Sequence, residues 1–260
     1  MPGSSKIMTI DFDEWTESSQ FNENGYSLTI LEIDDDQEAI DQLSSAVPGH
    51  FTSKYSTVLE RLGKTAAARF LEQKLPTSVS IKSGDLGEII ATEYIDAETD
   101  FEVPIKRLRW KDHRNMSMRG DDAIGVYFPA TDDEYIAFLK VESKSRKSLA
   151  NTPVQNARKA LDSNGGLPSP HSLLFVAERL YEANEDDKAD QIVLFQQNED
   201  IDNEQVEHML FTFSGNDPES YLKKDQSDYD DSYFQNTVGV FSGSHSQIIL
   251  DVFVLAGDVE

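Results

Sequence analysis

Two short segments of the chain combine residue types that support the hydrolysis of phosphate esters. The segment "VESKSR" contains Glu142 and Lys144, and the upstream segment "GDDAIGV" contains Asp121 and Asp122. Carboxylate oxygens bind Mg²⁺ and Mn²⁺ well, and a bound divalent ion polarises a phosphate and lowers the pKa of an attacking water. A lysine beside the ion orients that water and offsets the negative charge of the transition state. These residues therefore indicate metal-dependent phosphodiester hydrolysis.

Side-chain alternation along a predicted strand, "EYIAFLKVESK", places the acid and the lysine on one face. Side chains two residues apart in a strand point to the same side, so Glu142 and Lys144 share a face with Lys140. Apolar residues occupy both faces earlier in the segment, which predicts a strand that is covered on both sides. Because an unpaired charge is costly to bury, the far end of the strand must face a partner charge, a metal ion or solvent.

Pairing of this strand with the preceding one brings the acids together. The segment "GDDAIGVYFP" predicts a turn followed by a strand, and a hairpin through "PATDDEY" sets the start of that strand beside the end of the next. Asp122 then meets Glu142 and Lys144. Two adjacent carboxylates raise each other's pKa unless a divalent cation lies between them. We expect Asp122 and Glu142 to bind the metal; Asp121 is the alternative ligand, and Asp122 is favoured because it abuts the strand.

Glu88 lies beside the apolar stripe of a predicted helix, "SGDLGEIIATEYI". In a helix its direction differs by about 200° from those of Leu86 and Ile90, two members of that stripe. Gly84 and Gly87 are expected to let the helix pack closely on a sheet. Glu88 is therefore a candidate fourth acidic residue of the site, and an ordinary exposed helical glutamate is the alternative interpretation.

The distribution of charge places a basic segment inside an acidic chain. The 260 residues contain 23 Lys and Arg against 48 Asp and Glu, a formal net charge of −25. Between Pro104 and Ala160, twelve cations accompany seven acids, so this segment carries +5 and the remainder −30. Cations on one face bind nucleic acid by releasing counterions from its phosphates, whereas a chance cluster of solvated cations is the alternative. The candidates for contacting the DNA backbone are Arg119, Lys140, Arg146, Lys147, Arg158 and Lys159.

Composition excludes several classes of protein. The negative charge rules out a generally basic nucleic-acid-coating protein or a binder of anionic membranes. The absence of cysteine excludes disulfide scaffolds, Cys-ligated zinc, iron–sulfur clusters and thiol catalysis. The chain contains neither a P-loop motif for ATP nor a G-x-S-x-G elbow. No apolar run approaches the roughly 18 residues of a membrane-spanning helix, and "MPGSSKIM" lacks the apolar stretch of a signal peptide. We expect a cytoplasmic protein.

The order of predicted elements indicates an α/β or α+β fold in which helices flank a central mixed sheet. Residues 1–80 are expected to form an extension with a strand at "GYSLTILEID", a helix at "DDDQEAIDQLSSAVPG" and a long amphipathic helix ending at Pro76. Residues 81–180 form the core that carries the candidate site, with a further strand at "FEVPIKRLRW" and helices at "TPVQNARKALDS" and "SLLFVAERLYEAN". Residues 181–260 supply acidic loops and the strands "QIVLFQQ", "QVEHMLFTFSG" and "SQIILDVFVLAG", which complete the sheet or dock a partner.

The region from Glu88 to Lys144 carries a family resemblance. A helix with an acid, a glycine-Asp turn before a strand, and the "VESKSR" strand follow one another as in the PD-(D/E)xK nuclease superfamily, which the chain resembles. The stretch "SGDLGEIIATEYI…RLRWKDHRNMSMRGDDAIGVYF…FLKVESKSR", within about residues 80–160, is also similar to the HamA-type effectors of the Hachiman anti-phage defence system. The resemblance implies that residues 81–180 are a nuclease core with a PD-(D/E)xK-like sheet.

The same resemblance implies a bacterial DNA nuclease that uses Mg²⁺ or Mn²⁺ and is controlled by a companion superfamily 2 helicase. Asp122, Glu142 and Lys144 match the catalytic positions of the family, and Glu88 matches its helix acid. The chain departs from the superfamily pattern because no proline precedes the aspartate. This departure leaves Asp121 and Asp122 to be ranked by their distance from the strand.

Two other functions are compatible with the sequence. A catalytically silent subunit would use the same fold and its acidic loops only to bind a helicase or to mimic DNA, and it would show no effect of Mg²⁺ or Mn²⁺. A restriction-type enzyme that acts alone would cleave DNA without any companion protein.

Overall fold

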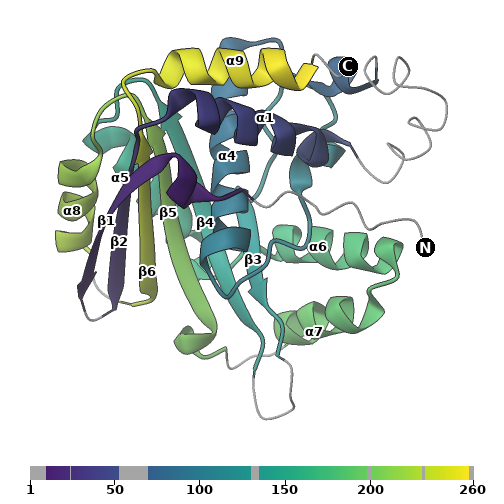
Figure 1. Cartoon of the computed structure of the whole chain (residues 1–260). Coiled ribbons are helices and arrows are strands. Elements are labelled where there is room, and N and C mark those ends of the chain that lie inside the picture. Colours follow the sequence, from purple (N-terminus) through teal and green to yellow (C-terminus); the bar gives the residue numbers. More distant parts are fainter. Residues whose placement is uncertain are drawn as a thin grey trace.

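A six-stranded mixed sheet forms the centre of the computed structural model, which describes residues 10–23, 25–52, 70–129, 135–197, 201–229 and 232–257. The strand order is β1-β2-β6-β5-β4-β3 (Figure 1). The strands are β1 (Thr16–Glu23), β2 (Tyr26–Ile33), β3 (Ala123–Tyr127), β4 (Ala137–Arg146), β5 (Val206–Ser214) and β6 (Phe234–Phe241). The expected mixed α/β architecture with a helix-flanked sheet is confirmed.

Seven helices flank this sheet in the described part of the chain. They are α1 (Asp36–Phe51), α4 (Val79–Glu98), α5 (Asn151–Leu161), α6 (Pro170–Ala183), α7 (Asp186–Gln197), α8 (Glu219–Ser227) and α9 (His245–Gly257). Short 3-10 turns cover Phe12–Glu14, Arg107–Trp110, Ser163–Gly166 and Asn203–Gln205. None of the described helices has the length and apolar character needed to cross a bilayer.

The pairing of the strands joins distant parts of the sequence. β2, β6, β5 and β4 run parallel to one another, whereas the edge strands β1 and β3 pair antiparallel with β2 and β4. Strands from residues 1–80, 81–180 and 181–260 therefore share one sheet, since β2 pairs with β6 and β5 with β4. Fully buried parallel strands need apolar side chains on both faces, as β5 and the first half of β4 have.

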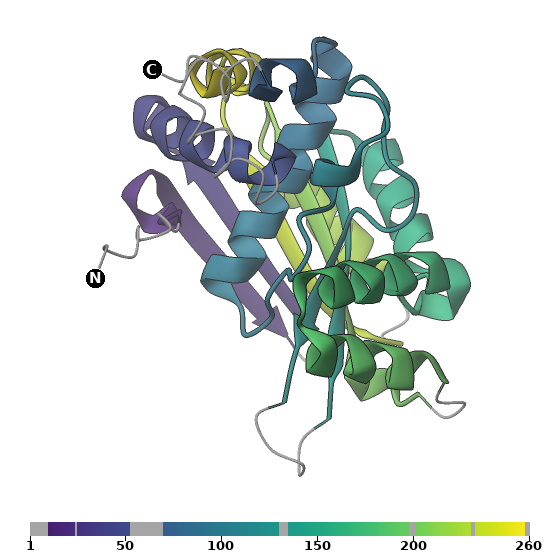
Figure 2. The ribbon, with the colours of Figure 1, turned by 90° about the vertical axis from the view of Figure 1, so that its right-hand side faces the viewer.

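The helices form layers on the two faces of the sheet. α1, α4 and α9 pack with β2, β4, β5 and β6 in one apolar cluster, and α5 and α8 pack on the opposite face. The α6–α7 pair covers β3 and the start of β4 in a third cluster. Figure 2 views the sheet from its β3 edge, with α1 and α4 on one side and α5 on the other.

Several predicted elements differ from the observed ones. α1 was expected to stop at the Pro-Gly pair, but it continues through Pro48 to Phe51. Phe51 is buried and contacts Phe253 of α9 with ring centroids 6.4 Å apart. Thr52 closes the helix by donating its N–H to the Pro48 carbonyl. Burial of the last turn therefore outweighs the lost hydrogen bond at proline.

The segment "FEVPIKRLRW" is not the predicted strand. Glu102 forms a single bridge with Val126, and the chain then turns through the 3-10 turn Arg107–Trp110. Pro104 has no N–H to continue a ladder. The cations that follow, Lys106, Arg107 and Lys111, pair with acids of α4. These ion pairs hold the segment over the helix, so it does not add a strand to the sheet.

Two predicted strands near the C-terminus are helices, α7 and α9. Short apolar runs do not separate strand from helix, and here the burial repeats with helical spacing. In α9 the buried residues are Ile248, Ile249, Val252, Phe253 and Ala256. β1 and β6 were not predicted, because β6 follows a dense acidic block and β1 is exposed over most of its length. Most of the predicted long helix before Pro76 lies outside the described residues, which are helical at positions 70–74.

The close approach of α8 to β6 depends on a glycine. A Cβ atom at Gly239 would lie 2.5 Å from Pro218 Cγ, 2.9 Å from Leu222 Cδ1 and 3.1 Å from Ile30 Cδ1. We expect Gly239→Ala to lower the free energy of unfolding by about 1–3 kcal/mol, measured in urea, because the added methyl group overpacks the interface. Gly243→Ala is the matched control, since no atom lies within 4 Å of its Cβ position. Equal stabilities of the two variants would contradict the prediction.

Candidate active site

The predicted hairpin is confirmed and sets Asp122 against the next strand. β3 and β4 pair antiparallel with Ala123 opposite Val141. The Asp122 N–H donates to the Val141 carbonyl over 3.2 Å, and the Asp122 carboxylate accepts the Ser143 N–H over 2.9 Å. Because both bonds use the backbone of β4, the carboxylate is fixed beside Glu142, at the point where β3 begins.

Glu142 and Lys144 form an ion pair on the free end of β4. Lys144 Nζ contacts Glu142 Oε1, and their side chains are 18% and 15% exposed. Burial and, to a lesser extent, the nearby charge of Asp122 raise the pKa of Glu142 to about 7, although Lys144 acts in the opposite direction. Glu142 is therefore an acid whose charge is disfavoured near neutral pH in the absence of an additional cation.

Glu88 reaches the same site from α4. The helix approaches β4 closely at Gly87, where a Cβ atom would lie 3.0 Å from Ser143 Oγ. The expected close packing is thus confirmed at Gly87 but not at Gly84, which has open space around it. Burial, opposed by Arg107 and reinforced by the charge of Asp122, raises the pKa of Glu88 to about 7. Glu88 is not an ordinary exposed glutamate.

Arg107 completes the cluster, although it is not among the site residues predicted from the sequence. Its Nε donates to Glu88 Oε2 over 3.0 Å and its Nη2 to Glu88 Oε1 over 3.2 Å. The same Nη2 lies 3.4 Å from Asp122 Oδ1. The sequence does indicate that several neighbouring acids need a positively charged partner. It does not indicate which of the many cations in the basic segment is that partner.

Ion pairs on both sides of Arg107 fasten its segment to α4. Lys111 Nζ donates to both oxygens of Asp85, over 2.8 and 2.7 Å, and both residues are buried. Lys106 contacts Glu93, which also accepts a 2.6 Å hydrogen bond from His50. Burial raises the pKa of Glu93, but its hydrogen bonds and charge interactions with His50 and Lys106 outweigh burial and lower the pKa to about 2. Arg107 is thus presented to the cluster by a segment that is anchored at two points.

Asp121 points to a different place from Asp122. Its Oδ2 accepts the Ser169 N–H over 2.8 Å, at the start of α6, and its N–H donates to Ser172 Oγ over 3.0 Å. Asp121 is buried there. The structure therefore brings Asp122 beside Glu142 and gives Asp121 a supporting position at the α6 terminus.

Lys140 is buried, although it was expected to contact DNA. Its side chain is 1% exposed, and Nζ donates over 2.7 Å to the carbonyls of Leu161 and Ser163. Leu161 is the last residue of α5 and Ser163 begins the 3-10 turn that follows, so the ammonium satisfies a carbonyl that the helix leaves unpaired and one just beyond it. Asp121 Oδ1 lies 3.9 Å away. Lys140 has no surface at which it could meet a phosphate, because it extends from β4 into the layer beneath α5.

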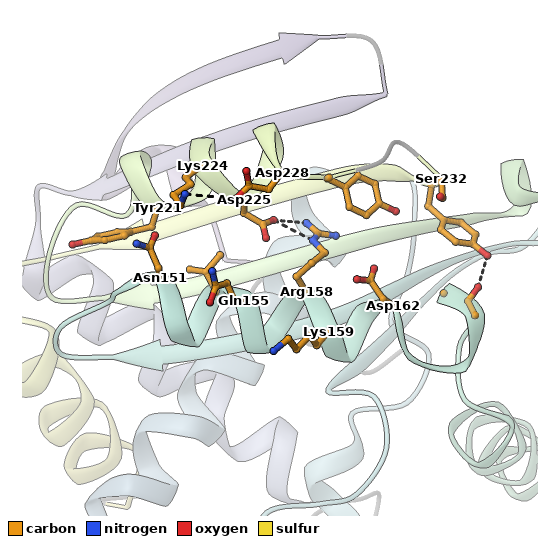
Figure 3. Close-up of a pocket in the computed structure, with 15 residues that line it drawn as sticks. Asn151, Gln155, Arg158, Lys159, Asp162, Tyr221, Lys224, Asp225, Asp228 and Ser232 are labelled. Carbon is orange, nitrogen blue, oxygen red and sulfur yellow. Dashed lines mark hydrogen bonds and ion pairs between the residues drawn. The ribbon is translucent and has the colours of Figure 1, made fainter.

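Arg158 is also committed to internal partners. Its Nη2 and Nε donate to Asp225 Oδ2 over 2.7 and 3.1 Å, and its guanidinium lies 4.6 Å from the ring centre of Tyr229. Figure 3 shows Arg158 extending from α5 toward Asp225 of α8, whereas Lys159 points away from it. Both line a cavity of about 680 Å³ between α5 and α8 that the acids of the candidate site do not line.

The remaining predicted DNA contacts are on the surface: Arg119, Arg146, Lys147 and Lys159. Arg119 lines a small cavity of about 50 Å³ together with Glu88, Arg107 and Asp122. The exposed cations therefore include one that can meet a phosphate beside the acidic cluster.

The acids suit a divalent ion that shares its coordination with the substrate. In the described part of the chain, no three acidic or histidine side chains are arranged as a complete metal cage. Mg²⁺, however, is commonly held by one or two carboxylates together with phosphate oxygens and water. Asp122 and Glu142 provide two adjacent carboxylates, and burial together with the charge of Asp122 disfavours the ionised form of Glu142 when no metal is bound. The donor set fits Mg²⁺ or Mn²⁺.

The raised pKa of Glu142 predicts a pH-dependent loss of stability. Since the folded protein holds this proton up to about pH 7 and the unfolded chain only to about pH 4.3, stability falls as the pH rises through this interval. In EDTA, we expect Glu142→Gln to be more stable than wild type by about 1–3 kcal/mol at pH 8, with no difference at pH 4. The exposed Glu204→Gln is the control, and a pH-independent gain would contradict the assignment. Urea unfolding measures both.

Comparison with known proteins agrees with the arrangement of these segments. A Hachiman protein HamA from Bacillus cereus is 28% identical over an alignment of 192 residues, and the match covers 68% of this chain and 66% of the relative. The chain therefore spans slightly less than two thirds of the length of that relative. The HamA family model matches residues 9–258 and so includes β1 through α9. A match over nearly all of the sequence shows that the chain belongs to the HamA family.

Proposed function

We propose that this chain is a Mg²⁺- or Mn²⁺-dependent DNA endonuclease that acts in Hachiman anti-phage defence, in the cytoplasm, under the control of a superfamily 2 helicase. The observation that carries the proposal is the convergence of Asp122, Glu142 and Lys144 where β3 meets β4. The order α4, β3, β4, α5, with an acid on the helix, supports a PD-(D/E)xK-like core. The defence role is supported by the name of the relative, a Hachiman protein.

Each residue of the cluster has a role in this reaction. Asp122 and Glu142 would hold the divalent ion, which supplies polarisation of the phosphate and a lowered pKa of bound water. Lys144, paired with Glu142, is placed to orient the attacking water and to offset the charge that develops on the phosphate. Glu88 supports the cluster from α4 through its contacts with Arg107.

The basic segment supports DNA as the substrate. The exposed cations Arg119, Arg146 and Lys147 lie within a basic segment of a chain that is otherwise acidic, which favours the approach of a polyanion to this segment. Arg119 lines the cavity that holds Asp122, and Arg146 and Lys147 follow the last charged residue of the cluster along β4. Contacts of this kind position the DNA backbone without selecting a base sequence.

A cleavage assay tests the proposal. We expect the chain, with its companion helicase, to cut DNA in Mg²⁺ and to leave it intact in EDTA. Asp122→Asn should remove this activity, because an amide oxygen is a weaker ligand than a carboxylate. Metal-dependent cleavage that is unchanged in Asp122→Asn would contradict the assigned site.

A catalytically silent subunit is the second candidate, and one observation favours it. Arg107 and Lys144 already accompany the acids, as cations do in a structural ion-pair cluster. Calorimetric titration of Lys144→Ala with Mn²⁺ in the presence of DNA separates the two functions, since this variant keeps both proposed ligands. If Lys144→Ala binds Mn²⁺ and the double variant Lys144→Ala/Asp122→Asn does not, the nuclease is supported. If Lys144→Ala binds no Mn²⁺, the silent subunit is supported.

A further inference from the structure

The guanidinium of Arg107 lies among the acids that the proposed reaction needs. It makes a two-pronged contact with Glu88, over 3.0 and 3.2 Å, and approaches Asp122 Oδ1 to 3.4 Å. The charge of Glu142 also acts on it. One fixed cation thus faces the three carboxylates of the cluster.

The remaining donors of Arg107 are also occupied. Nη1 donates to the carbonyl oxygen of Asp121 and lies 3.4 Å from that of Arg119. The side chain is 11% exposed. A planar guanidinium presents five donors in a fixed fork, and here every edge of it meets an acceptor. This is a built position rather than a chance surface contact.

The flanking ion pairs keep Arg107 at this place. Lys106 and Lys111 tie the segment to Glu93 and Asp85 on α4, on either side of Arg107. Because these ion pairs hold the backbone of the segment, a movement of the guanidinium away from the acids would require rotation of the Arg107 side chain alone. A guanidinium also pairs with phosphate oxygens through two parallel hydrogen bonds, as it does with a carboxylate.

We propose that Arg107 is an internal counter-ion that competes with the divalent metal for the carboxylates, so that the metal binds tightly only when a DNA phosphate draws the guanidinium away. The proposal rests on the proposed function and adds a restraint supplied by the chain itself. A positive charge a few ångströms from a divalent ion opposes its binding strongly at the effective dielectric of a protein surface. The divalent metal and DNA then bind cooperatively. When DNA is absent, the Arg107 guanidinium provides the counter-charge of the metal-free acids.

Titration with Mn²⁺ in the absence of DNA tests this competition. We expect Arg107→Gln to bind Mn²⁺ at least about tenfold more tightly than wild type, measured by calorimetry on the full chain. Arg109→Gln is the matched control: it lies on the same turn and makes the same change of net charge, but its Nε donates to the Gly49 carbonyl, outside the cluster. Equal or weaker Mn²⁺ binding by Arg107→Gln, relative to Arg109→Gln, overturns the proposal.

A second pair of variants protects the test against misfolding, since Arg107→Gln leaves Glu88 buried without its partner. Glu88→Gln and Glu88→Gln/Arg107→Gln differ only by the guanidinium, and the double variant should bind Mn²⁺ at least about tenfold more tightly than the single one. Unchanged Mn²⁺ affinity with weaker DNA binding would make Arg107 a phosphate ligand alone and would overturn the competition. If that result accompanies cleavage that depends on Asp122, the proposed function stands. If the wild-type chain neither binds Mn²⁺ nor cleaves DNA, both the competition and the proposed function are rejected.

Discussion

Replacing Lys144 by alanine is expected to lower the rate of DNA cleavage by a factor of at least about 10² to 10³. Lys144 Nζ lies against Glu142 at the end of β4, where a positive charge can stabilise the phosphate as it gains negative charge. The measurement is the rate of cutting of linear and supercoiled DNA in Mg²⁺, with the companion helicase present.

The fold should survive this substitution, because the Lys144 side chain is partly exposed and lies outside the apolar clusters. Circular dichroism and thermal unfolding check this. Lys223→Ala is the control, since Lys223 is a partly exposed residue of α8 that also pairs with a glutamate, Glu219. A Lys144→Ala variant that cuts DNA as fast as Lys223→Ala would remove Lys144 from the reaction.

Replacing Lys140 by methionine is expected to have the largest effect on stability, a loss of about 2–5 kcal/mol. Methionine fills a similar volume but donates no hydrogen bond. The carbonyls of Leu161 and Ser163 would then be buried without their 2.7 Å partner, and Asp121 would lose the cation 3.9 Å from its carboxylate. Urea unfolding measures the change.

Lys159→Met is the matched control for Lys140→Met, because Lys159 is exposed on the helix that Lys140 closes. It should change the free energy of unfolding by about 0.5 kcal/mol or less. Equal stabilities of the two variants would show that the Lys140 ammonium does not hold the end of α5.

The local part of the site could be predicted from the sequence. Alternation along "FLKVESK" separates Leu139 and Val141 from Phe138, and these residues lie in different apolar clusters. The position of Asp122 opposite Glu142 follows from a hairpin between neighbouring segments, and β3 and β4 form that hairpin. Such features depend on strand periodicity and on the pairing of strands that are consecutive in the sequence, and both can be recognised locally.

The part of the site that depends on distant contacts could not be predicted. Arg107 reaches the acids because its segment folds over α4, held by the pair Lys111–Asp85, 26 residues apart in the sequence. Charge alone also gave no information on burial: Lys140 and Arg158 look like their exposed neighbours in the sequence, but each has internal acceptors. These acceptors are carbonyl and carboxylate oxygens that only the tertiary structure brings near.

The acidic character of the rest of the chain has a consequence for the proposed nuclease. A net charge of −25 disfavours the approach of nucleic acid to most of the surface, so DNA would approach most readily at the exposed cations of the basic segment. Glu88 and Asp122 are also ion-paired with Arg107. Together, the repulsion and these ion pairs favour an enzyme that is inactive until DNA is brought to its site. A companion helicase is suited to that presentation.

The most direct test of the account is the position of a bound metal. Crystals of Lys144→Ala with DNA and Mn²⁺ keep both proposed ligands while slowing the reaction, and anomalous diffraction locates Mn²⁺ independently of the protein phases. We predict a peak at coordination distance from the carboxylates of Asp122 and Glu142, with a phosphate oxygen as a further ligand. DNA bound in the basic segment with no Mn²⁺ at these carboxylates would contradict the central claim.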